Sequence, residues 1–163
     1  MPDDLTLVEL RCSAVVPRVD EVLLVRHERD HASYWVLPGG HPRSGEIASA
    51  AVAREVREET GLAVDIGRVL FLWEGIDPDA GRRILEIVFI AQLRDGEPES
   101  RPDETARFFP LSELPADLYP PVAGYLKGAW REGFPRSAPY LGNMWRGMNS
   151  VASSELHAVG GTG

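Results

Sequence analysis

The sequence predicts an α+β fold in a single domain of 163 residues, a length that fits one domain. Three observations predict this class: Val- and Leu-rich segments typical of strands over 7–16 and 22–26, a helical stretch over 47–60, and a strand pair over 63–73 and 83–93. We expect the domain to occupy residues 1–149. Residues 150–163 are small and polar and end in Gly-Gly-Thr-Gly, so we expect a disordered tail there.

The N-terminal half begins with two predicted strands. Residues 7–16 and 22–26 are joined by a segment with Pro17, Asp20 and Glu21, which predicts a turn. Residues 27–33 are polar and predict a loop. The aromatic and apolar run that follows, from Tyr34, stops at Pro38, Gly39 and Gly40.

The middle of the chain predicts a helix and then a hairpin. Residues 47–60 contain four alanines with Glu and Arg, and no Gly or Pro. Gly61 follows at the position where helices commonly end in the left-handed conformation. The segment Asp77-Pro78-Asp79-Ala80-Gly81 has the composition of a turn, so 63–73 and 83–93 should pair.

The C-terminal part predicts fewer elements. Residues 95–104 form a polar loop, and the apolar segment 107–111 predicts a short last strand. Prolines open a predicted second helix at about 121–131. The tract 140–145 contains Tyr140 and Trp145, and it packs either on its own domain or on a second subunit, which leaves a homodimer open.

Composition excludes several classes of function. A formal net charge of −8 lacks the basic surface of a nucleic-acid binder and argues against docking on an anionic membrane. No apolar stretch is long enough to span a bilayer. Cys12, the single cysteine, lies in an apolar run, so we expect its small side chain to be buried. The acidic start, Met1 to Asp4, does not resemble a signal peptide, so a cytoplasmic location is expected.

Three glutamates in the predicted helix point to chemistry. Glu55, Glu58 and Glu59 stand at i, i+3 and i+4, so their carboxylates fall on one face, and Arg54 can reach Glu58. Like charges at this spacing repel, and a hard divalent cation offsets the repulsion because carboxylate oxygen suits Mg²⁺ or Mn²⁺. For an arbitrary helix, a solvated acidic face is the simpler interpretation.

The residues around the helix favour the metal interpretation. Gly39 and Gly40 precede the helix, where backbone can approach a phosphate or metal closely. From Gly40 to Leu62 the chain resembles the Nudix box, G-x5-E-x7-R-E-U-x-E-E-x-G-U with U apolar. The specified positions all match, and they are Gly40, Glu46, Arg54, Glu55, Val56, Glu58, Glu59, Gly61 and Leu62.

This resemblance implies a fold, a reaction and a set of site residues. The family has an α/β/α sandwich with a central mixed β-sheet, and it hydrolyses a nucleoside diphosphate linked to another group, usually with Mg²⁺ and with Mn²⁺ as a substitute. Glu55, Glu58, Glu59 and the Gly39 carbonyl would then bind metal. Arg54 would orient a glutamate, and Glu46 and Gly40 would have supporting roles.

The identity of the catalytic base stays open. Within the family the base is either a box glutamate, here Glu58 or Glu55, or a residue of a later loop. The loop candidate is Glu104, with Asp103 and Glu99 as rivals. One position departs from the family: Ile47 stands where Ser, Thr or Pro often begins the helix. The cap then comes from Ser44 or Ser49 or is lost, at a cost of about 1 kcal/mol.

Substrate contacts lie outside the box. Arg82, Arg83 and His41 are the candidates for phosphate or ribose, and His27 and His31 lie nearby in the predicted fold. The aromatic residues that could stack on a base, though core packing is commoner, are Tyr34, Trp35, Phe71, Trp73, Phe89 and Phe109. Pro78 is weakly favourable to an ADP-ribose pyrophosphatase, and nucleoside triphosphates remain an equal alternative. A nucleotide-sensing module without turnover is the other hypothesis.

Overall fold

The computed structural model describes residues 6–29, 31–99 and 106–146. Its elements along the chain are β1 (Val8–Val15), β2 (Pro17–Arg18), β3 (Glu21–Arg29), β4 (Ala32–Val36), β5 (Gly39–Gly40), α1 (Ala48–Thr60), β6 (Ala63–Ile76), β7 (Arg83–Asp95), β8 (Ala106–Pro110), α2 (Ala123–Arg131) and β9 (Tyr140–Asn143). The predicted tail 150–163 lies outside the described residues, so the domain boundary stays a prediction.

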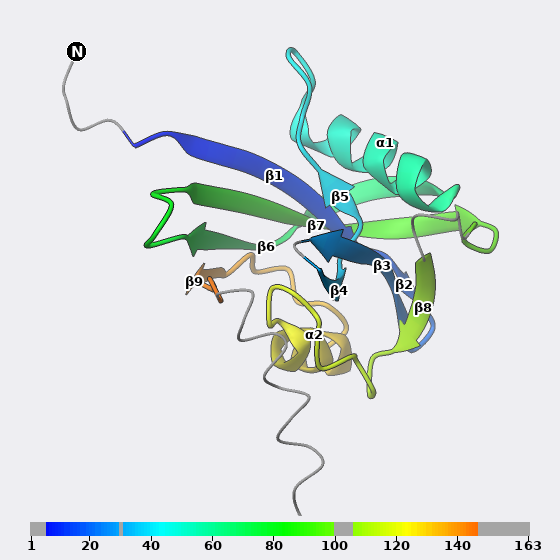
Figure 1. The fold of residues 1–163 in the computed structure, drawn as a ribbon. Helices are drawn as coiled ribbons and strands as arrows, with labels where there is room; N and C mark the ends of the chain where they lie inside the picture. Colours follow the sequence, from blue (N-terminus) through cyan, green and yellow to red (C-terminus); the bar gives the residue numbers. More distant parts are fainter. Residues whose placement is uncertain (1–5, 30, 100–105, 147–163) are drawn as a thin grey trace, which may run out of the picture.

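A mixed sheet forms the centre of the molecule. Its strand order is β5-β1-β7-β6-β9, with β1 parallel to β7 and β6 parallel to β9. A smaller antiparallel sheet contains β2, β3 and β4, with β8 paired to β3. Figure 1 shows α1 on one side of the larger sheet and α2 on the other. The predicted α+β class with a central mixed sheet is confirmed.

The two faces of the larger sheet bury separate cores. Cys12 and Ala14 of β1 pack with Val52 and Val56 of α1. Val15, one residue further on, faces the other core, which is shared by the smaller sheet and α2. This alternation follows from the period of two along a strand. Burial also raises the pKa of the Cys12 thiol to about 11, which fits a small core side chain.

The two ends of α1 differ in how they are capped. The N-cap residue, Ile47, makes no side-chain capping hydrogen bond, so neither Ser44 nor Ser49 replaces the missing cap. At the other end Gly61 has a φ of 76°, and its N–H donates to the carbonyl of Arg57. The predicted left-handed helix end is confirmed.

Two parts of the chain differ from the sequence-based expectation. The predicted loop 27–33 is wrong, because β3 continues to Arg29 and pairs with β4, with His27 opposite Tyr34. The prediction failed because this end of the β3–β4 hairpin is exposed and carries polar side chains, so the segment lacks the apolar pattern that predicts a strand. The strand β9 was not predicted; it pairs with β6 of its own domain, so the 140–145 tract packs on its own domain.

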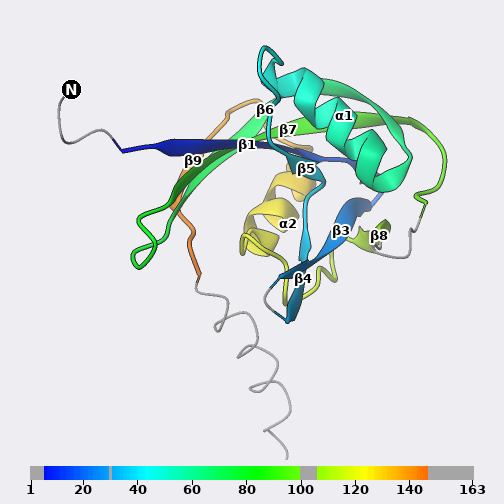
Figure 2. The same ribbon diagram turned by 45° about the horizontal axis from the view of Figure 1, so that its top comes forward.

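One end of the larger sheet extends past both helices. Figure 2 shows the start of β1 and the hairpin between β6 and β7 projecting beyond α1 and α2. This extension contributes the outer wall of the pocket described below. None of the helices in the described ranges is long and apolar enough to cross a membrane.

Candidate active site

The Gly39–Gly40 segment brings the sheet edge against the box helix. Gly40 pairs with Cys12 and Gly39 with Ser13 of β1. A Cβ on Gly39 would lie 2.2 Å from the Cys12 carbonyl oxygen, and a Cβ on Gly40 would lie 2.6 Å from the Glu55 carboxyl carbon. Gly39 therefore requires glycine because a Cβ would meet the β1 backbone, whereas the missing Cβ at Gly40 leaves room for the end of the Glu55 side chain.

Arg54 is the centre of an ion-pair network, which we call the Arg54 cluster (Arg54, Glu46, Glu55 and Glu58). Its Nε and Nη2 each donate to one oxygen of Glu46 at 2.9 Å, and its Nη1 donates to Glu55 at 2.7 Å and Glu58 at 3.1 Å. Nη2 also donates to the His41 carbonyl at 3.1 Å. The predicted contact with Glu58 is confirmed, and one guanidinium positions three carboxylates.

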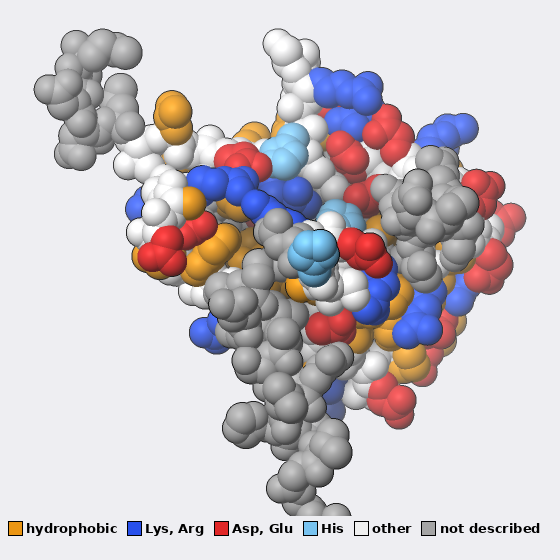
Figure 3. Space-filling view, viewed as in Figure 1, with side chains coloured by type: hydrophobic (Ala, Val, Ile, Leu, Met, Phe, Trp, Pro, Cys, Tyr) orange, Lys and Arg blue, Asp and Glu red, His pale blue; other side chains and the backbone are white. Residues whose placement is uncertain are grey.

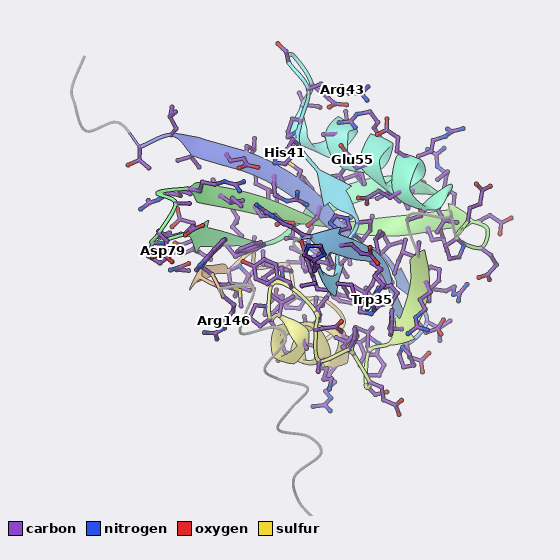
Figure 4. The ribbon with its side chains drawn as sticks, in the orientation of Figure 1. Trp35, His41, Arg43, Glu55, Asp79 and Arg146 are labelled. Atoms are coloured by element: carbon purple, nitrogen blue, oxygen red, sulfur yellow. The ribbon has the colours of Figure 1, made fainter. Side chains whose placement is uncertain are left out.

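Glu46 is held in its charged form. The Arg54 guanidinium, with a further hydrogen bond from the Arg43 N–H, lowers the pKa of the Glu46 carboxyl to about 2. Figure 4 shows Arg43 on the loop before α1, on the side where His41 and Glu55 lie. This arrangement agrees with a supporting role for Glu46, because its carboxylate closes the loop onto Arg54.

Glu59 lies in a different environment. It is 8% exposed, accepts a hydrogen bond from the Gly39 N–H at 3.0 Å, and lies 3.4 Å from Nε2 of His27. Burial raises the pKa of its carboxyl, and the contact with His27 opposes that rise. We call Glu59, His27 and Gly39 the buried site.

The donor chemistry of these residues fits a divalent cation. Carboxylate oxygens are the ligands that Mg²⁺ and Mn²⁺ prefer, and a buried carboxylate such as Glu59 gains most from a cation. As the side chains of the described residues stand, no three His, Cys, Asp or Glu groups converge closely enough to hold a metal ion. Glu55 and Glu58 instead share Arg54, and Glu59 faces His27. The ligand set stays a prediction.

A pocket of about 190 Å³ adjoins the buried site through His27. Its lining combines aromatic and apolar surface with arginines and two acids; the residues the argument uses are Glu9, Arg11, Arg82, Trp73, Glu86 and Tyr119. Figure 3 shows basic (blue), histidine (pale blue) and acidic (red) side chains near one another on this face of the molecule. Burial raises the pKa of the Tyr119 hydroxyl to about 12, so it stays protonated at neutral pH.

The fold places two of the three predicted substrate contacts in the pocket lining and the third outside it. His41 and Arg82 both line the pocket and both pair with Glu9, with 2.7 Å between Arg82 Nη2 and Glu9 Oε2. Arg82 lowers the pKa of the Glu9 carboxyl. Arg83 does not line this pocket, and its Nη1 lies 4.0 Å from Glu74.

Of the three loop candidates for the base, one lies within the described residues. Glu104 and Asp103 lie outside the described residues. Glu99 is exposed and lies against Gly61, beyond the C-terminal end of α1. Of the candidate aromatics, Tyr34 and Trp73 line the pocket, whereas Trp35, Phe71, Phe89 and Phe109 are buried in the cores.

Sequence reasoning missed several pocket residues, of which Glu86 and Arg11 are the clearest. Each is a charged residue inside an apolar strand, Glu86 within 83–93 and Arg11 within 7–16. A charge at an inward position of such a strand is rare unless it has a partner or a function. That signal was present in the sequence.

A comparison with protein-family models decides the relationship. The model described as the NUDIX domain matches residues 10–127. The chain belongs to the Nudix family. A curated Nudix relative from Methanocaldococcus jannaschii, named ADP-ribose pyrophosphatase, is 32% identical over 103 residues, which are 62% of this chain and 61% of that protein. A MutT-like protein of Streptomyces ambofaciens is 33% identical over 111 residues, 66% of this chain and 69% of that protein.

Solved Nudix structures share the fold. A MutT NUDIX hydrolase from Burkholderia pseudomallei superposes with a TM-score of 0.61 at 32% identity, covering 67% of this chain and 88% of that one. An ADP-ribose pyrophosphatase from Streptococcus suis gives 0.64 at 26% identity, covering 81% and 98%. The α/β/α arrangement implied by the box is thereby confirmed.

Proposed function

We propose that this chain hydrolyses a diphosphate bond in a nucleoside diphosphate linked to another group, by attack of water on phosphorus. The observation that carries the proposal is the placement of the three box glutamates on α1 beside a pocket: Glu55 and Glu58 accept hydrogen bonds from Arg54, and Glu59 accepts one from Gly39. Membership of the Nudix family supports the same reaction.

The roles of the box residues follow from their surroundings. Glu55, Glu58, Glu59 and the Gly39 carbonyl would hold Mg²⁺, with Mn²⁺ as a substitute. The ion would supply charge neutralisation at the diphosphate and a lower pKa for water. Arg54 fixes the orientation of Glu55 and Glu58, and Glu46 fixes Arg54 through two hydrogen bonds.

Glu58 is our first choice for the base. Its side chain is 49% exposed, so it can reach a water molecule and return the proton to solvent. Glu104 is the alternative from the later loop. His41 and Arg82 would contact phosphate or ribose from the pocket side, with Arg83 behind them at the start of β7.

The substrate class favoured is ADP-ribose or a related sugar nucleotide. The archaeal relative and the streptococcal structure both carry the name ADP-ribose pyrophosphatase. The pocket offers aromatic surface from Tyr34 and Trp73 together with arginine side chains, which suits a nucleotide. Nucleoside triphosphates are the alternative class.

A substrate panel tests the proposal. Purified protein is incubated with ADP-ribose, other sugar nucleotides, dinucleoside polyphosphates and nucleoside triphosphates, in Mg²⁺ with and without chelator. Mass spectrometry then identifies the products. Release of a nucleoside monophosphate that stops with chelator is the expected result. Tight binding of one of these nucleotides with no product over hours would contradict hydrolysis and favour a sensing module.

A further inference from the structure

Arg11, Glu86 and Trp73 form a row across three strands of the larger sheet. Arg11 on β1 lies opposite Glu86 on β7, and Glu86 lies opposite Trp73 on β6. Residues paired across strands project from the same face of a sheet. All three line the pocket, and none belongs to the Arg54 cluster or the buried site.

Glu86 is a buried carboxylate whose charge is weakly compensated. It is 5% exposed, and its one ion pair among the described residues is with Arg11, with 3.7 Å between Nε and Oε2. That separation exceeds the hydrogen-bond range of about 2.7–3.2 Å. A buried carboxylate without hydrogen bonds is costly, so a purely structural ion pair should have closer geometry. The Glu86 oxygens keep acceptor capacity on the pocket side.

Trp73 adds a donor beside this acceptor. Its Nε1 is buried and has no hydrogen-bond partner within the described part of the chain. An indole N–H can only donate, and buried polar groups are normally paired. Trp73 and Glu86 are cross-strand neighbours and both line the pocket, so unpaired polar groups lie on two adjacent residues at the place where a ligand would bind.

We propose that Glu86 is a substrate-binding residue that determines specificity. Its carboxylate accepts a hydrogen bond from an O–H or N–H group of the substrate, and the indole of Trp73 lies next to it in the pocket lining. The inference rests on the proposed function and adds to it a substrate-binding residue from outside the Nudix box. In ADP-ribose this chemistry has three sources: the hydroxyls of the terminal ribose, the vicinal hydroxyls of the adenosine ribose and the amino group of adenine.

Four probes distinguish the three sources: ADP-ribose and three analogues, which lack the hydroxyls of the terminal ribose, the hydroxyls of the adenosine ribose, or the amino group of adenine. Each is tested with wild type, Glu86→Gln and Glu74→Gln. Glu74 is the matched control, because it lies next to Trp73 on β6 but does not line the pocket and accepts a hydrogen bond from Tyr140. Glutamine keeps the shape of Glu86 but replaces one carboxylate oxygen with an NH2 group, which would face the substrate donor.

We expect Glu86→Gln to raise KM for ADP-ribose roughly tenfold to a hundredfold with little change in kcat, as for loss of a hydrogen bond to a charged group. Glu74→Gln should behave as wild type. The probe that lacks the recognised group should give similar KM values with wild type and Glu86→Gln. An equal loss on all four probes, a loss in kcat alone, or no loss would overturn the inference.

A binding measurement separates this inference from the proposed function. The methylene analogue of ADP-ribose, which resists hydrolysis, is titrated in Mg²⁺ by calorimetry. If wild type binds it but cleaves no nucleotide, hydrolysis fails as a function, while weaker binding by Glu86→Gln still supports the inference. If wild type neither binds nor cleaves these probes, both fail. Should Glu86→Gln not fold, Glu86→Asp, which keeps the charge on a shorter side chain, is expected to show an intermediate rise in KM, and an unchanged KM would overturn the inference.

Discussion

The Arg54 cluster and the buried site shift the pKa values of Glu46 and Glu59 in opposite directions. In the cluster a guanidinium donates to three glutamates, and the pKa of Glu46 falls to about 2. One residue after Glu58, burial raises the pKa of Glu59. Helical spacing predicts that Glu55, Glu58 and Glu59 share a face. Burial and hydrogen-bond partners, which spacing does not express, lower the pKa of Glu46 and raise that of Glu59.

The largest effect should come from the exposed member of the cluster. Glu58→Gln removes a charge that the proposed reaction uses, so turnover should fall on the order of 100-fold or more. The fold should persist, because a half-exposed side chain contributes little to stability. Initial rates and a thermal melt measure both. Unchanged turnover would remove Glu58 from the site.

The second-largest effect should come from Arg54, which donates hydrogen bonds to all three glutamates of the cluster. Arg54→Lys keeps the charge but loses the fork that holds Glu46 by two hydrogen bonds while reaching Glu55 and Glu58. Turnover should fall roughly tenfold to a hundredfold, as for groups that orient metal ligands. The exposed Arg57 on the same helix provides the control, and Arg57→Lys should leave the rate unchanged. Equal rates for both variants would contradict the assigned role.

The two glycines should separate activity from stability. In Gly40→Ala the new methyl meets the end of the Glu55 side chain, which can swing away, so turnover should fall about tenfold or more while the melting temperature changes little. In Gly39→Ala the methyl meets the β1 backbone, so unfolding should become easier by about 1–3 kcal/mol. Rates and denaturant titrations of both variants test this. The reverse pattern would show that the glycines were assigned wrongly.

The smallest effects are those of pH on stability, measured in chelator. The pKa of Glu59 is raised in the folded state above the ordinary 4.5. Its contribution to stability is therefore present below pH 4.5 and is lost as pH rises from 4.5 through the raised folded-state pKa. Glutamine at this position stays neutral. The melting temperature of Glu59→Gln relative to wild type should therefore rise between pH 4 and pH 7.

Glu46 should show the opposite slope. Its folded pKa of about 2 lies below 4.5, so its stabilisation is complete above 4.5 and is lost as pH falls toward 2. Glu46→Gln should melt below wild type at pH 7, and the difference should shrink with acid. Parallel slopes for the two variants would show that the two environments are not opposed as described.

The box could be predicted from the sequence because its information is local. The i, i+4 spacing predicts the contact between Arg54 and Glu58, and Gly61 predicts the end of α1. The double hydrogen bond from Arg54 to Glu46 spans eight residues and the whole start of the helix, and the contact between Glu59 and His27 joins a helix to another sheet. Such contacts depend on tertiary packing, which spacing does not express.

The pocket was harder to predict for the same reason. His41 and Arg82 were predicted as separate substrate contacts, but Glu9, far from both along the chain, brings them together. The strand β9 depends on parallel pairing with β6, and no local pattern in 140–145 specifies that partner. The inward charge of Glu86 was visible in the sequence, but its neighbours Arg11 and Trp73 came only from strand register.

The central claim is that Glu55 and Glu58 of the Arg54 cluster bind a divalent cation together with Glu59 of the buried site. Titration of Mn²⁺ followed by electron paramagnetic resonance tests it directly on wild type, Glu55→Gln, Glu59→Gln and the control Glu74→Gln. The account predicts that Mn²⁺ binds to wild type and the control with similar affinity and about tenfold or more weakly to both Glu55→Gln and Glu59→Gln. Equal Mn²⁺ affinity in all four proteins would contradict it.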